Sequence, residues 1–126
     1  MRLLAGTAIL IGAILILATF MFFQTSALSE NLLESLHLIE QNVEQGNWEE
    51  ALQEVKTLDK VWEKADNWWT PFMDHKETEL LDMSMTRVSK WVEIHNKENA
   101  LVEIGVARRM VENFRGKEVP NLKNIF

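Results

Sequence analysis

The chain has 126 residues, of which 47% are hydrophobic and 25% are charged, and its formal net charge is −6 at pH 7. That length allows one domain. Lysine and arginine are outnumbered and unclustered, which argues against a nucleic-acid partner, and without cysteine the fold has to be stabilised by packing and not by disulfides.

An uncharged apolar segment, residues 3–23, opens the chain and is rich in leucine, isoleucine, alanine and phenylalanine. At about 1.5 Å of rise per residue, a helix of this length matches the roughly 30 Å core of a bilayer. Arg2 precedes the segment and no further lysine or arginine appears until Lys56, so the positive-inside rule predicts a cytoplasmic N-terminus. The sequence therefore predicts a single-pass anchor over residues 1–27, in contact with the lipid bilayer, and an extracytoplasmic domain over residues 28–126.

A secretory signal peptide is the alternative interpretation of the same segment. Thr25-Ser26-Ala27 offers small residues, and cleavage after Ala27 would release the rest of the chain as a secreted protein. The apolar core of a signal peptide is typically about 7 to 15 residues long, and this segment is longer. Its length therefore favours the uncleaved anchor.

Two helical hairpins are predicted after the anchor, over residues 28–66 and 72–115. In the first, apolar residues at helical spacing run from Leu28 to Val43 and from Trp48 to Trp62, and Gly46-Asn47 marks the stop between them. This hairpin ends near Asp66-Asn67.

The second hairpin has the same organisation. Pro71 suits a helix start, and an apolar stripe follows from Phe72 to Val92. His95-Asn96 forms the turn, and a last stripe runs from Ala100 to Phe114 before a tail over residues 116–126. No stretch alternates at period two for long enough to form a strand, so the predicted class is all-α.

A shift of 49 positions aligns one hairpin with the other. The stretch from Asn47 to Val55 falls on the stretch from Asn96 to Ile104, with identity at the Asn, the first Glu, the Ala, the Leu and the second Glu. Each hairpin alone exposes an apolar face, and stacking the two buries both. The predicted fold is an N-terminal transmembrane helix followed by a four-helix bundle made of two repeated antiparallel hairpins.

The turn between the hairpins contains candidate membrane-interface residues. Helices that alternate in direction would return residues 66–73 and the tail to the membrane, and would place Gly46-Asn47 and His95-Asn96 far from it. Aromatic residues are enriched at membrane interfaces, where an apolar ring and a polar edge are both satisfied. The alternative is that the two tryptophans close the base of the bundle. The candidates are Trp68, Trp69 and Phe72.

Polar residues that could carry chemistry gather at the start of the third predicted helix. The chain has no cysteine, glycine-rich phosphate loop or serine nucleophile elbow, so neither an enzyme nor a bound cofactor is predicted. His75 and Glu79, at i and i+4, could chelate a divalent cation with a third ligand. We favour the alternative, an exposed ion pair at an acidic helix N-terminus, and predict no metal site. Candidates for contact with a partner are Asp74, His75 and Glu77.

A family resemblance rests on four motifs together with the short N-terminal span. They are Trp48-Glu49-Glu50-Ala51, Trp62, Asp74-His75-Lys76-Glu77 and Leu122-Lys123-Asn124-Ile125-Phe126. The chain resembles a bacterial family catalogued as domain of unknown function 4363, which implies a small single-pass protein of the bacterial cell membrane with no assigned activity. Members tend to read Asp-His-x-Glu-Ile-Asp where this chain ends in Thr-Glu, so a shared acidic site would be shifted.

The function predicted from these features is that of a membrane-anchored interaction or scaffolding module. Its helical bundle would dock on a multi-span membrane protein or associate with its own copies. The alternative is an extracytoplasmic bundle that senses a ligand or a metal ion, with the His75 cluster as the receiving site.

Overall fold

Four helices make up the part of the chain that the computed structural model describes, residues 1–71 and 73–118, with side chains described up to residue 114. They are α1 (Arg2–Glu44), α2 (Trp48–Trp69), α3 (His75–Glu93) and α4 (Lys97–Glu118). The described residues contain no strand. The predicted all-α class is therefore confirmed.

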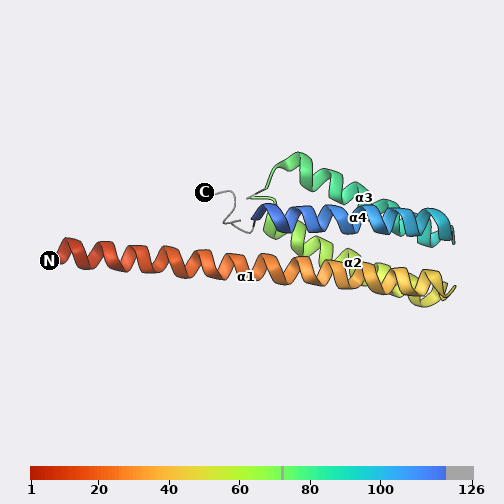
Figure 1. Ribbon diagram of the computed structural model, residues 1–126, viewed down its shortest axis with the longest axis horizontal. Coiled ribbons are helices and arrows are strands. Elements are labelled where there is room, and N and C mark those ends of the chain that lie inside the picture. Colours follow the sequence, from red (N-terminus) through yellow and green to blue (C-terminus); the bar gives the residue numbers. More distant parts are fainter. Residues whose placement is uncertain (72, 119–126) are drawn as a thin grey trace.

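Helix α1 joins the predicted anchor and the first helix of the bundle in one continuous element of 43 residues. Residues 24–27 are polar or small but include no glycine or proline, so no residue there breaks the helix. At about 1.5 Å per residue the helix is about 64 Å long. Its N-terminal half extends beyond the bundle with no other element beside it (Figure 1). The apolar segment is thus a continuous helical extension of the bundle.

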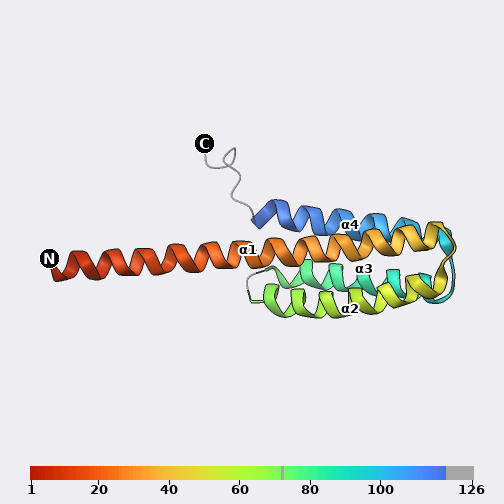
Figure 2. The ribbon, with the colours of Figure 1, turned by 90° about the horizontal axis from the view of Figure 1, so that it is seen from below.

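The bundle places each helix beside two others. α1 packs against α2 and α4, and α3 packs against the same two helices. All four helices run along the bundle, and the turn between α2 and α3 lies at the end from which α1 extends, while the other two turns lie at the opposite, distal end (Figure 2). This arrangement agrees with the topology predicted from helix alternation.

The core follows the 49-residue repeat position by position. Four buried residues of α1, from Leu32 to Val43, correspond to four buried residues of α3, from Leu81 to Val92. Five buried residues of α2, from Ala51 to Ala65, correspond to five of α4, from Ala100 to Phe114. The repeat predicted from the sequence therefore lies in the packing itself, and the two hairpins form a bundle with approximate two-fold internal symmetry.

The two distal turns have the same backbone hydrogen bonds. The amide of Asn47 donates to the carbonyl of Asn42 at 2.8 Å, and the amide of Asn96 donates to the carbonyl of Trp91 at 2.9 Å. This pattern ends a helix with one residue in the left-handed region. That residue is Gly46 in the first turn, with φ of 76°, and His95 in the second, with φ of 57°.

Three helix ends differ from the prediction. α2 continues past residue 66 to Trp69, because Ala65 and Trp69 extend its buried stripe. α3 begins at His75 and not at residue 72, because the Asp74 carboxylate caps it by accepting a hydrogen bond from the amide of Lys76 at 3.1 Å. α4 continues past residue 115 to Glu118.

Candidate functional site

Trp68, near the end of α2, contacts the segment where α1 leaves the bundle. Its Nε1 donates a hydrogen bond to Oγ1 of Thr25 at 3.2 Å. Its ring also packs edge-on against Phe20, with 6.2 Å between ring centroids. Because Phe20 belongs to the apolar segment, Trp68 ties the bundle to the last turn of that segment. We call Phe20, Thr25 and Trp68 the base contact.

Trp69, the neighbouring residue, has a different environment. Its side chain is 1% exposed and lies 6.2 Å from the Trp62 ring and 5.1 Å from the Phe114 ring, centroid to centroid. Trp69 is therefore a core residue that closes the base of the bundle, and burial keeps its ring from any lipid. Of the three candidate membrane-interface residues, Trp68 alone has a described, partly exposed ring. Phe72 lies outside the described residues, as does the tail from Val119 to Phe126.

The acidic start of α3 is an ordinary helix N-terminus in its geometry. Asp74 is the N-cap, and the hydroxyl of Thr78 donates to the carbonyl of His75 at 2.9 Å. His75 and Glu79 are both exposed. Among the described residues, no three His, Asp or Glu side chains converge as metal ligands. The interaction role of Asp74, His75 and Glu77 and the sensing alternative remain predictions.

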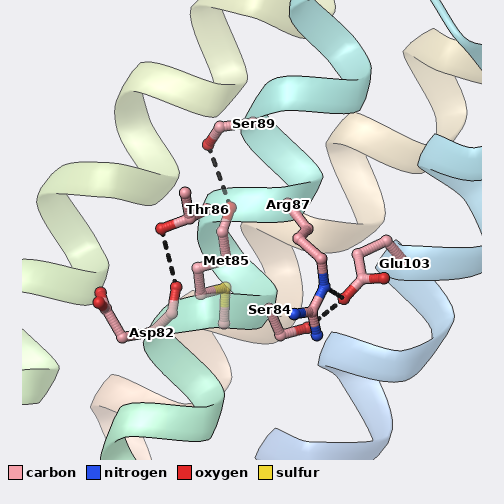
Figure 3. Close-up of polar contacts among 7 residues, drawn as sticks. All are labelled: Asp82, Ser84, Met85, Thr86, Arg87, Ser89 and Glu103. Carbon is pink, nitrogen blue, oxygen red and sulfur yellow. Dashed lines mark hydrogen bonds and ion pairs between the residues drawn. The ribbon is translucent and has the colours of Figure 1, made fainter.

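A polar contact between α3 and α4 holds the second hairpin together. Glu103 accepts hydrogen bonds from the hydroxyl of Ser84 at 3.0 Å and from Nε of Arg87 at 2.9 Å (Figure 3). A charge-assisted contact with a buried serine on one side fixes the register of the two helices. Two further hydroxyls, of Thr86 and Ser89, donate to carbonyls within α3.

Two equivalent positions of the repeat make different contacts between the hairpins. Arg108 of α4 forms an ion pair with Glu40 of α1. In the 49-residue repeat, Arg108 corresponds to Asp59 of α2 and Glu40 corresponds to Ser89 of α3. At these equivalent positions the Ser89 hydroxyl donates a hydrogen bond to the Asp59 carboxylate at 3.4 Å. Burial raises the pKa of Asp59, the hydrogen bond from Ser89 opposes that change, and the nearby charge of Glu93 adds to it.

C-terminal to the apolar segment, exposed large apolar side chains are confined to the second hairpin in the described part of the chain. Val102 and Val106 are 65% and 38% exposed, and their i, i+4 spacing puts them on one face of α4. Between residues 24 and 69, no large apolar side chain is exposed. The sequence contained this signal, because Val102 and Val106 lie outside the apolar stripe that α4 buries. Sequence analysis used the stripe to place the helix and did not consider the apolar residues outside it. The set comprises Leu80, Met83, Ile94, Val102 and Val106.

A family model described as "Domain of unknown function (DUF4363)" matches residues 19–125. The chain belongs to this family. The match confirms the resemblance found in the sequence motifs, and it begins one residue before Phe20. The DUF4363 unit thus includes all three residues of the base contact and both hairpins. No curated protein and no solved structure matches the chain.

Proposed function

We propose that this DUF4363 protein is a membrane-anchored interaction module that uses the outer surface of α3 and α4 to dock on another membrane protein. α1 would cross the bacterial cell membrane with its N-terminus in the cytoplasm, and the bundle would stand outside the cytoplasm. One helix in the described residues is long and apolar enough to span a bilayer, and none of its apolar window is buried against the other described residues.

The observation that carries the docking proposal is the confinement of exposed apolar side chains to the second hairpin. The two hairpins bury equivalent core positions, so packing within the bundle gives no reason for one of them to expose Leu80, Val102 and Val106. Apolar side chains that gather on one surface of a soluble domain are typical of protein contacts. A second copy of the chain would be the other occupant of this surface.

Site-directed photo-crosslinking tests the proposal directly, because the chain has no native cysteine. A Val102→Cys variant, labelled with a benzophenone and returned to native membranes, is expected to form a crosslinked adduct. Thr57→Cys, an exposed position on the outer face of α2, is the matched control and is expected to form much less. An adduct of twice the monomer mass indicates self-association, and any other discrete mass indicates a different partner.

Two results would contradict the docking surface. One is equal crosslinking from Val102→Cys and Thr57→Cys, and the other is the absence of a discrete adduct from both. Val106→Asp, added to Val102→Cys, should abolish a specific adduct while circular dichroism shows unchanged helix content, because the new charge lies on the solvent side of α4.

A further inference from the structure

We propose that the base of the bundle is also a lipid-binding surface, with Trp68 and the turn residues Thr70 and Pro71 resting in the headgroup layer of the phospholipid bilayer that α1 crosses. This inference rests on the membrane span of the proposed function and adds a second contact between the chain and the bilayer. The occupant of the surface is the phospholipid headgroup layer, and the contact would hold the bundle upright on the membrane.

The height of Trp68 along α1 is the first argument. Residues 3–23 fill the roughly 30 Å apolar core of a bilayer, and headgroups add about 5 to 7 Å on each side, which is about four residues of helix. Trp68 contacts Phe20 and Thr25, one on either side of the predicted edge of the apolar core. The first core residue of the bundle, Leu28, then lies where the headgroup layer ends. The ring of Trp68 is thus at the depth that tryptophan prefers.

The base contact also fixes the turn in position. The hydrogen bond from Trp68 to Thr25 and the ring contact with Phe20 hold the end of α2 against α1, so the bundle cannot tilt away at that end without breaking both. Thr70 and Pro71 follow directly and are exposed. Phe23, at the same height on α1, is 66% exposed. Aromatic side chains from two helices therefore surround the edge of the apolar segment, as in an interfacial aromatic belt.

The distribution of charge along the bundle favours the same orientation. The twelve residues of each helix nearest the distal turns (33–44, 48–59, 82–93 and 97–108) hold eleven acidic and five basic residues, which accounts for the whole formal charge of −6. The base half of the bundle (residues 28–32, 60–81 and 109–118) holds eight acidic and six basic residues, and the two other basic residues of the chain are Arg2 and Lys123. Bilayers that contain anionic lipid have a negative surface potential that repels acidic groups. The less acidic half of the bundle therefore faces the lipid and the more acidic half is held away.

Spin-label accessibility in vesicles tests this placement with the full-length chain. Single-cysteine variants at Thr70, in the turn at the base, at Gln45, in a distal turn, and at Ile14, in the apolar segment, are each labelled with a nitroxide and reconstituted into phosphatidylcholine–phosphatidylglycerol vesicles. The label at Thr70 is expected to collide several-fold less often with a water-soluble nickel complex than the label at Gln45. Trp68→Ala, added to Thr70→Cys, should raise that collision rate, whereas Trp48→Ala, at the distal end, should leave it unchanged.

The three positions separate failure of this inference from failure of the span. If the label at Ile14 collides with oxygen in preference to the nickel complex while the label at Thr70 is as accessible to nickel as that at Gln45, the span stands and the lipid-binding base is wrong. If the label at Ile14 is itself accessible to nickel, the apolar segment does not cross the bilayer, and both proposals fall. Helix content of every variant is checked by circular dichroism in the same vesicles.

Discussion

The first hairpin, α1 and α2, and the second, α3 and α4, bury the same positions of a 49-residue repeat but present different surfaces. The first is extended at one end by the apolar segment and supplies Trp68 and Trp69 at the base. The second exposes large apolar side chains on its outer surface and contains the Ser84, Arg87 and Glu103 contact. The shared positions therefore maintain the bundle, and the two proposals rest on the positions at which the hairpins differ.

The contacts that join the two hairpins extend this comparison. Internal two-fold symmetry makes the α1–α4 and α2–α3 interfaces equivalent, yet an ion pair between Arg108 and Glu40 in one is replaced by the Asp59 and Ser89 hydrogen bond in the other. Trp62 adds a hydrogen bond from its Nε1 to Asp82 at 2.7 Å in the α2–α3 interface. Polar contacts thus differ between interfaces whose apolar cores correspond, which shows that the repeat fixes packing more closely than polar pairing.

The aromatic base of the first hairpin gives the largest expected effect. Trp69 has no apolar counterpart, because a shift of 49 leads to Glu118. Trp69→Ala is expected to lower the free energy of unfolding by about 3–5 kcal/mol, because it removes a fully buried ring from contact with Trp62 and Phe114. Urea unfolding of the full chain in detergent micelles, followed by circular dichroism, measures this change.

Trp69→Phe is the matched control for that experiment. It keeps most of the ring volume and removes Nε1, which is buried without a hydrogen-bond partner among the described residues. The loss should therefore be much smaller than for alanine. A loss below about 1 kcal/mol for Trp69→Ala would mean that the base is not part of the cooperative core.

Trp69 also shows how far the sequence could predict the fold. Apolar spacing placed the four helices, and the 49-residue shift placed the hairpins, because both depend on local periodicity. The end of α2 was missed because Asp66-Asn67 is a typical stop, whereas contact with Phe114, 45 residues later in the chain, decided the outcome. Local signals favour one helix end, and tertiary packing selected another.

The candidate site was less predictable, for a related reason. The topology placed Trp68 and Trp69 at the base, but it could not separate them, because adjacent helical residues point in different directions and only the register of α2 against α1 decides which one reaches Thr25. The exposed Val102 and Val106 likewise depend on which face of α4 meets α3. Such properties follow from packing register, which single-helix patterns do not contain.

Substitutions in the two distal turns are expected to have the next largest effect on stability. Gly46 and His95 occupy equivalent positions of the repeat, and both have a left-handed backbone conformation. Gly46→Ala adds a Cβ with open space around it, so the expected loss of about 1 kcal/mol comes from the backbone conformation alone. His95→Gly removes the energetic cost of the same backbone conformation, but it also removes the ring that stacks on Trp48, with 4.7 Å between ring centroids. The two effects should nearly cancel in the native background.

A double-mutant cycle separates the conformation from the stacking. In a Trp48→Ala background, where there is no ring to stack on, His95→Gly should stabilise the chain by about 0.5–1 kcal/mol, as measured by the same urea unfolding. The coupling between the two substitutions reports the stacking, with an expected size of about 0.5–1.5 kcal/mol. A coupling of zero would show that Trp48 and His95 do not stabilise the distal end together.

Asp59 gives the smallest expected effect and tests the α2–α3 interface against its symmetric equivalent. Because burial raises the pKa of Asp59, the folded chain binds its proton more tightly than the unfolded chain does, and stability falls as pH rises through the interval between the unfolded and folded pKa values. Above that interval the carboxylate is ionised in both states and the cost is complete. Asp59 is only partly covered by the bundle and its residue as a whole is exposed, so Asp59→Asn should be slightly stabilising at pH 7, by less than about 0.5 kcal/mol. The difference from the native chain should vanish in acid, below the ordinary pKa of an aspartate.

Glu63→Gln is the control for this experiment, because it removes one charge from the same helix. An equal gain in stability from both variants at pH 7 would assign the effect to the net acidity of the bundle and not to the surroundings of Asp59.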